Sequence, residues 1–289
     1  MMKSSSVDQK VTRPALRWHG GKWKLAPWII DQFPPHRIYT EVYGGAASVL
    51  LRKPRCYSVV YNDLDGAVVN FFQVLRNEQT ANQLVELLEK TPYSRTDYFA
   101  ALEPSEDSVE DARRLVVRSY MGFGSNAVNP KVVSGFRSNS NRSGSTPAHD
   151  WRNYPLALTK VIKRLRGVVI ESRPALQVLK DHDAPDALHY VDPPYVHSTR
   201  CSSTTKPSKG YVHEMTDEDH RELAQVLQQL QGSVVLSGYA CDLYDKELFT
   251  NWQRIERKAH ADGARERVEV LWLNDAAATA QLPLLQGVS

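Results

Sequence analysis

The stretch Leu188-His189-Tyr190-Val191-Asp192-Pro193-Pro194-Tyr195 decides how the rest of the chain is interpreted. Its first half is typical of a short buried strand, and its second half places a carboxylate, two prolines and an aromatic ring at the end of that strand. Proline fixes φ at about −65° and lacks an N–H, so the paired prolines stiffen the backbone and leave the Pro193 carbonyl free to accept a hydrogen bond. Asp192 supplies a second acceptor, and Tyr195 supplies a flat face for stacking. The stretch suits a planar, amino-bearing ring, although a strand followed by a stiff turn explains the same residues.

A strand, a small-residue turn and a helix are expected earlier in the chain. Ile38–Tyr43 has strand character and leads through Gly44-Gly45-Ala46-Ala47 into an apolar segment. The next expected strand, Tyr57–Tyr61, ends at Asn62 and Asp63. A glycine turn lets a ligand approach the backbone, and a carboxylate after the following strand suits a ribose diol. The turn lacks the spaced glycines of a dinucleotide site and has no phosphate-binding lysine, which favours a nucleoside without a pyrophosphate. A plain turn, with Asp63 as a helix cap, is the alternative.

Near the N-terminus, Leu16–Lys24 contains two glycines between two tryptophans, with basic residues close by. This segment suits a loop over a ligand, with Trp18 as an apolar wall and Lys22 facing a carboxylate. A surface loop with scattered charge explains it equally well.

Taken in order, these motifs resemble those of the Dam-like adenine-N6 DNA methyltransferases, over roughly Leu16 to Asn274. The tetrapeptide Asp192–Tyr195 and the order of the motifs are specific, whereas any other single motif is not. The resemblance rests on Arg17–Lys22, Glu41–Ala46, Tyr61–Asp63, Asp192–Tyr195, His213–Thr216, Val234–Tyr239 and Arg267–Trp272. His19, Val42 and Ala46 depart from the common family pattern, but none of these departures removes a group that takes part in the chemistry.

The resemblance implies S-adenosylmethionine as cofactor, double-stranded DNA as partner and no metal. It implies that Asp192, Pro193, Pro194 and Tyr195 are catalytic and act on the N6 amino group of a flipped-out adenine. The cofactor-binding residues that it implies are Trp18, Lys22, Glu41, Tyr43, Gly44, Gly45, Asp63 and Asp192. An adenine in RNA, the N4 amino group of cytosine and a protein amide are alternative acceptors. A relative that binds DNA without turnover is a further alternative.

A basic stretch indicates where DNA would be contacted. The whole chain has a net charge of only +3, yet from Arg113 to Arg166 there are eleven Lys or Arg residues and one acidic residue, Asp150. Part of this stretch, from Gly122 to Gly144, is rich in Gly, Ser and Asn. Lys and Arg neutralise phosphates, Arg pairs with guanine and Asn pairs with adenine. A solvated surface loop is the alternative. With the resemblance, the expected DNA-binding residues are Asn126, Arg137, Asn139 and Arg142.

The order of expected elements predicts an α/β fold with a mostly parallel, Rossmann-like sheet and an inserted helical target-recognition subdomain. Helical periodicity runs from Phe71 to Lys90, from Val109 to Tyr120 and from Leu156 to Leu165. Strand patterns precede this region and return after it. We expect residues 12–70 and 161–280 to form the catalytic domain, residues 71–160 to form the inserted subdomain, and the ligands to lie beyond the carboxyl ends of the strands.

Composition bounds these expectations. The 289 residues suffice for one large domain or two modest ones, and neither a long apolar run nor an apolar signal core is present. Cys56, Cys201 and Cys241 are odd in number and scattered, which fits a reducing cytoplasm better than a disulfide framework or a zinc site. We therefore expect a soluble cytoplasmic protein, a monomer without an obligate protein partner and without membrane association.

Overall fold

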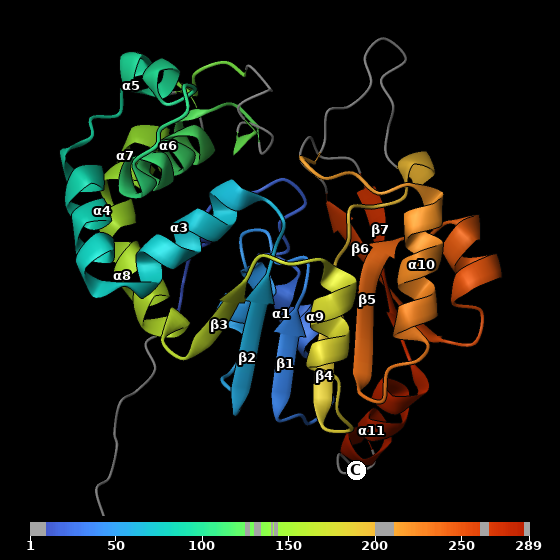
Figure 1. Ribbon diagram of the computed structural model, residues 1–289. Helices are drawn as coiled ribbons and strands as arrows, with labels where there is room; N and C mark the ends of the chain where they lie inside the picture. Colours follow the sequence, from blue (N-terminus) through green and yellow to red (C-terminus); the bar gives the residue numbers. More distant parts are fainter. Residues whose placement is uncertain are drawn as a thin grey trace, which may run out of the picture. The chain divides into compact units, whose positions relative to one another are not determined.

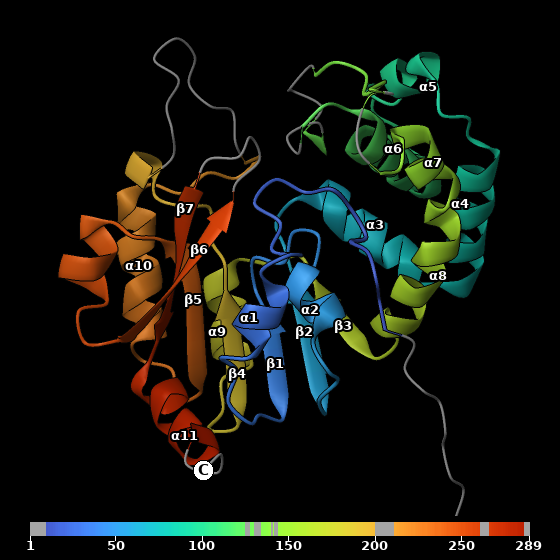
Figure 2. The same ribbon diagram turned by 180° about the vertical axis from the view of Figure 1, so that it is seen from behind.

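The computed structural model describes residues 10–124, 128–129, 134–139, 141, 144–199, 211–260 and 266–285. The chain divides into two compact units (Figures 1 and 2). Within the described residues, a sheet unit comprises Lys24–Val69 and Gly167–Ser289, and a helical unit comprises Met1–Trp23 and Asn70–Arg166. The chain passes from the sheet unit to the helical unit within helix α3 (Gly66–Arg76).

Over the described residues, seven strands form one sheet in the order β3-β2-β1-β4-β5-β7-β6. Strands β3, β2, β1, β4 and β5 are parallel, while β7 runs antiparallel to β5 and β6 antiparallel to β7. The α/β class and the mostly parallel sheet are thus confirmed. Because β1 lies between β2 and β4, the strand order changes direction there, which is where such sheets bind ligands. The strands are β1 (Ile38–Glu41), β2 (Ser58–Asn62), β3 (Val168–Glu171), β4 (Ala187–Val191), β5 (Ser233–Tyr239), β6 (Gln253–His260) and β7 (Glu266–Leu273).

Helices cover both faces of this sheet (Figures 1 and 2). Helices α9 (Ala175–Asp181) and α10 (Asp217–Leu227) lie on one face, and α1 (Ala26–Ile30) and α2 (Ser48–Arg52) lie on the other. All five residues of β4 are consequently buried, as its apolar sequence predicts. The unit also contains η2 (His197–Thr199), η3 (Leu243–Leu248) and α11 (Asp275–Leu285).

The helical unit is built around α6 (Ser108–Met121), which packs against α4 (Glu78–Lys90), α5 (Arg95–Ala100) and α7 (Pro147–Arg152). Helix α8 (Tyr154–Leu165) packs against α4 and α7. The helical periodicity expected from Phe71 to Lys90 is interrupted at Asn77, whose side chain accepts hydrogen bonds from the amides of Gln79 and Thr80. Asn77 therefore caps a new helix, because its side chain satisfies amides that have no partner within the helix.

The N-terminal segment is bonded to this helical unit. The amide of Arg17 donates a hydrogen bond to the Ser119 hydroxyl at 2.7 Å. The same hydroxyl donates to the Arg17 carbonyl. Tyr120 and Tyr154 donate to the carbonyls of Pro14 and Ala15. The segment that contains Trp18 and Lys22 is therefore fixed to α6 and α8. No helix in the described part of the chain is both long and apolar enough to span a membrane.

Candidate active site

Three acidic residues lie at the carboxyl ends of adjacent parallel strands of the sheet unit. Glu41 is the last residue of β1, Asp63 follows β2, and Asp192 follows β4. Glu41 is paired in register with Tyr61 of β2 on one side and with Tyr190 of β4 on the other. The three carboxylates therefore lie at the carboxyl-terminal side of the sheet, near the change in strand order, where ligands of such folds bind.

The glycine turn after β1 is shaped by the ring of Tyr61. A Cβ added to Gly44 would lie 2.2 Å from the Tyr61 ring, so only glycine fits there. Gly45 has a φ of 46° and Ala47 a φ of 53°, both in the left-handed region. The Tyr61 hydroxyl donates to the Gly45 carbonyl at 2.7 Å, and the Ala47 amide donates to the Gly44 carbonyl at 2.8 Å. Packing and hydrogen bonds of the chain itself thus hold the turn tightly.

Asp63 connects the end of β2 to this turn. Its Oδ2 accepts a hydrogen bond from the Gly45 amide at 2.7 Å, and its Oδ1 accepts one from the Asp65 amide at 2.8 Å. Desolvation raises the pKa of Asp63, and the two backbone hydrogen bonds oppose that rise. Each carboxylate oxygen has a second acceptor position, so Asp63 can hold the turn and still accept hydrogen bonds from a diol.

Glu41 also holds backbone in place. It is 3% exposed, and its Oε2 accepts hydrogen bonds from the Tyr39 hydroxyl at 2.6 Å and from the Leu50 amide at 2.8 Å. Leu50 lies in the first turn of α2, where amides have no partner within the helix. Glu41 therefore anchors α2 to β1. Tyr43, two residues further on, is half-buried, and burial raises the pKa of its hydroxyl.

The tetrapeptide after β4 is mostly enclosed. Pro193, Pro194 and Tyr195 are buried, and Asp192 is half-buried. The Tyr195 hydroxyl donates to the carboxylate of Glu269 and lies 3.2 Å from the Ser237 hydroxyl. Burial raises the pKa of Tyr195, and the charges of Asp192 and Glu269 raise it further, so the phenol stays neutral.

A second ring accompanies Tyr195. The ring centroid of Tyr239 lies 4.6 Å from that of Tyr195, with an interplanar angle of 78°. Ser237, Tyr239 and Glu269 are not among the site residues expected from the sequence, although the C-terminal motifs of the resemblance contain them. The pairing of β5 with β7 sets Tyr239 opposite Glu269, and no periodicity in the sequence specifies that pairing.

The expected cofactor-binding residues are divided between the two units. Within the sheet unit, Glu41, Tyr43, Gly44, Gly45, Asp63 and Asp192 follow neighbouring strands. Trp18 and Lys22 belong to the helical unit. Trp18 is half-buried, and the buried Lys22 donates from its Nζ to the Gly20 carbonyl at 2.8 Å.

The expected DNA-binding stretch begins where α6 ends. The Phe123 amide donates to the Gly135 carbonyl at 2.8 Å and the Arg137 amide to the Met121 carbonyl at 2.7 Å, so two segments run side by side. Phe123 is 71% exposed, Arg137 is half-buried and Asn139 is exposed. The other two expected DNA-binding residues, Asn126 and Arg142, lie outside the described residues.

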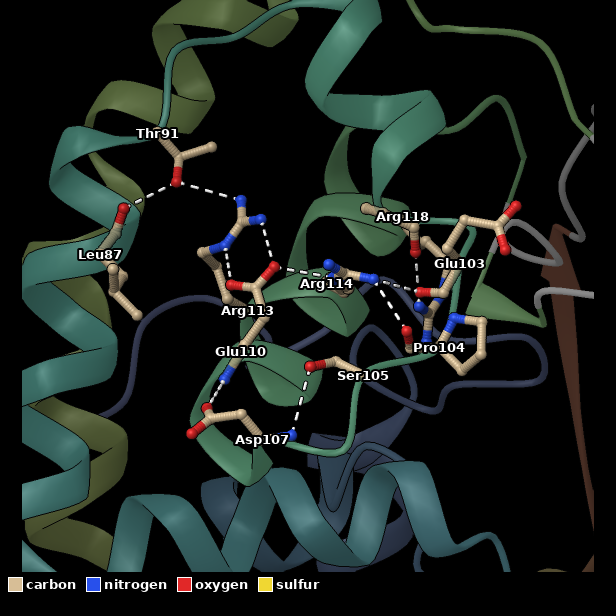
Figure 3. Close-up of polar contacts among 11 residues, drawn as sticks. Leu87, Thr91, Glu103, Pro104, Ser105, Asp107, Glu110, Arg113, Arg114 and Arg118 are labelled. Atoms are coloured by element: carbon tan, nitrogen blue, oxygen red, sulfur yellow. Dashed lines mark hydrogen bonds and ion pairs between the residues drawn. The ribbon is translucent and has the colours of Figure 1, made fainter.

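Several arginines of the basic stretch have structural partners (Figure 3). Glu110, just before the stretch begins, accepts hydrogen bonds from both Arg113 and Arg114. Arg114 also donates to the carbonyls of Glu103 and Pro104.

Arg118 is only 3% exposed and donates to the Ala101 carbonyl at 2.7 Å, and Arg164 is 7% exposed. The excess of ten positive charges between Arg113 and Arg166 therefore overstates the cations that can meet DNA.

Comparison with known proteins bears on these two regions. A family model described as D12 class N6 adenine-specific DNA methyltransferase matches residues 18–262. A search of curated proteins gives no match. The family match contains the acid-bearing strand ends, the tetrapeptide and the helical unit from Trp18 onward.

Proposed function

The chain belongs to the D12 class N6 adenine-specific DNA methyltransferase family, and we propose that Asp192, Pro193, Pro194 and Tyr195 carry its reaction. The reaction of this family is methylation of adenine N6 in DNA, and the family uses S-adenosylmethionine. The observation that carries the proposal is the position of Asp192. It directly follows β4 at the change in strand order, and the buried Pro193 and Pro194 come next.

The chemistry explains why these residue types are needed. The adenine amino group is a poor nucleophile because its lone pair is delocalised into the ring. The Asp192 carboxylate and the Pro193 carbonyl accept its two N–H hydrogen bonds, which favours the more tetrahedral, positively charged nitrogen of the transition state. Tyr195 stacks on the flipped-out base, an interaction worth about 1–3 kcal/mol. Positioning lowers the rest of the barrier.

The donor set of the sheet edge fits the proposed cofactor. S-adenosylmethionine supplies an electrophilic methyl group on a positively charged sulfur. Asp63 accepts hydrogen bonds from its ribose hydroxyls, and the turn at Gly44 and Gly45 brings the backbone close to it. The remaining residues assigned to the cofactor are Trp18, Lys22, Glu41, Tyr43 and Asp192.

We further propose that the helical unit recognises a specific sequence in double-stranded DNA. Arg137 and Asn139 offer the donors and acceptors that read base edges, and we assign Asn126 and Arg142 to the same role. The exposed ring of Phe123 suits insertion at a base step. The protein acts as a monomer in this proposal.

The test of the residue assignment is a comparison of DNA from cells that lack endogenous methylation. The cells express the wild-type chain, Asp192→Ala, or Asp217→Ala as a control at an exposed acid of the same unit. We expect N6-methyladenine with the wild type and the control and none with Asp192→Ala. Because the other residues assigned to the cofactor are intact in this variant, its binding of S-adenosylmethionine should remain measurable in a calorimetric titration. Full activity of Asp192→Ala would refute the assignment. Methylated cytosine in place of methylated adenine would show that the acceptor differs.

A further inference from the structure

A buried carboxylate lies next to the tetrapeptide. Glu269, in β7, is 3% exposed and is followed by Val270, Leu271 and Trp272, which are fully buried. It accepts hydrogen bonds from the Tyr195 hydroxyl and, at 3.3 Å, from the Ser237 hydroxyl. Removing a carboxylate from water is costly, and an apolar residue of similar volume would suit this core better. Packing alone therefore does not explain Glu269.

The ring of Tyr195 is restricted by its backbone, by its hydroxyl and by a neighbouring ring. The backbone at its Cβ end is stiffened by Pro193 and Pro194, and the hydroxyl at its far end is held by Glu269. With both ends held, the remaining freedom is rotation of the ring about its long axis. The ring of Tyr239, nearly perpendicular at 4.6 Å, limits that rotation.

From these contacts we infer that Glu269 is a positioning residue for methyl transfer and that it acts through Tyr195. The inference rests on the proposed function, in which Tyr195 stacks on the target adenine. By holding the hydroxyl, the carboxylate sets the plane of the ring before the base arrives. As a charged acceptor it also enriches the ring in electrons, which favours the positive charge that develops on the adenine nitrogen. Both effects act on the rate of transfer and leave cofactor binding unchanged.

The test compares four variants with the wild type. Glu269→Gln keeps the volume and a weaker acceptor, Tyr195→Phe keeps the stacking ring, and a third variant combines the two changes. Tyr244→Phe is the matched control, because it removes a buried tyrosine hydroxyl bonded to His220 in the same unit. Single-turnover rates are measured with radiolabelled S-adenosylmethionine on DNA from cells that lack adenine methylation. Cofactor affinity, the KM for DNA and the melting temperature are measured in parallel.

We expect Glu269→Gln and Tyr195→Phe each to lower the maximal rate about 10- to 100-fold, the size expected for misplacing a reacting group by about 1 Å. Cofactor affinity should stay within about twofold of the wild type. Because both changes break one interaction, the double variant should be no slower than the slower single variant. Tyr244→Phe should lower the melting temperature without lowering the rate of the folded protein.

Two results would overturn the inference while leaving the proposed function in place. One is a Glu269→Gln protein with a lower melting temperature and an unchanged rate. The other is a double variant whose loss is the product of the two single losses. If Glu269→Gln does not fold, Tyr195→Phe alone decides, since an undiminished rate without the hydroxyl would leave Glu269 with no route to the reaction. Failure of the wild type to methylate adenine would instead refute the proposed function, and the inference with it.

Discussion

Replacing Gly44 with alanine tests whether the glycine turn is shaped by the protein itself. The added Cβ would lie 2.2 Å from one ring carbon of Tyr61 and 2.6 Å from the next, closer than real Cβ contacts come. The φ of Gly44 is not positive, so the conflict is steric. The ring cannot retreat easily, because Tyr61 is fully buried and its hydroxyl donates to Gly45. The turn must therefore move.

The expected cost has two parts. Overpacking of this kind costs about 1–3 kcal/mol. Displacing the turn also weakens the hydrogen bond between the Gly45 amide and Asp63, and a hydrogen bond to a charged group contributes about 1.5–3 kcal/mol. The sum, about 2.5–6 kcal/mol, corresponds to a fall in melting temperature of about 5–24 °C for a domain of 150–250 residues. Affinity for S-adenosylmethionine should fall as well, because the same turn is assigned to the cofactor.

The assay is differential scanning calorimetry together with a calorimetric titration of the cofactor. Gly66→Ala is the matched control, because a Cβ at Gly66 meets no atom within 4 Å and that residue begins helix α3. The control should melt at the wild-type temperature or slightly above it, since alanine favours helix. If Gly44→Ala melted and bound the cofactor as the wild type does, the account of the turn would be refuted.

Three further changes distinguish surface, core and titrating residues. Arg137→Ala should weaken or relax DNA recognition with little effect on cofactor affinity, as fluorescence anisotropy over a salt series would show. Arg118→Ala should instead lower the melting temperature, because its buried guanidinium donates to the Ala101 carbonyl. Burial lowers the pKa of His189 in the folded protein below its ordinary value of 6.5. As the pH falls, the unfolded chain is therefore protonated at this histidine before the folded protein is, and the free energy of unfolding decreases below about pH 6.5. Urea unfolding of His189→Gln should show a smaller loss between about pH 7 and 5.

How much of the fold the sequence predicts depends on where each strand lies. Central strands such as β4 are buried on both faces and have apolar sequences that identify them. The sequence does not predict β6, because Gln253–His260 is polar or charged at most positions. It lies at the edge of the sheet and pairs only with β7 among the described strands. Charged side chains are common on such edges because they oppose pairing with other chains.

The site shows the same division between local and distant relations. The tetrapeptide and the glycine turn are each a continuous stretch of sequence, so the sequence alone indicates their chemistry. The hydrogen bond from Tyr195 to Glu269 joins residues 74 positions apart, and no periodicity specifies it. Counting charges also fails to reveal pairing, which is why the stretch from Arg113 looks more available to DNA than its contacts with Glu110 allow.

Asp63 and Glu41, at the carboxyl ends of the parallel strands, hold the backbone and are also assigned to the cofactor. Removing either carboxylate would therefore affect both roles at once. Asp63 already accepts from the amides of Gly45 and Asp65, and Glu41 from that of Leu50. A cofactor that uses their remaining acceptor positions would therefore meet a turn ordered before it binds, and binding would not have to order it. An Asp63→Asn change presents an amide N–H where the turn needs an acceptor, so it should disturb the turn and the ribose contact together. We therefore expect the rigidity of this turn and the affinity for the cofactor to change together.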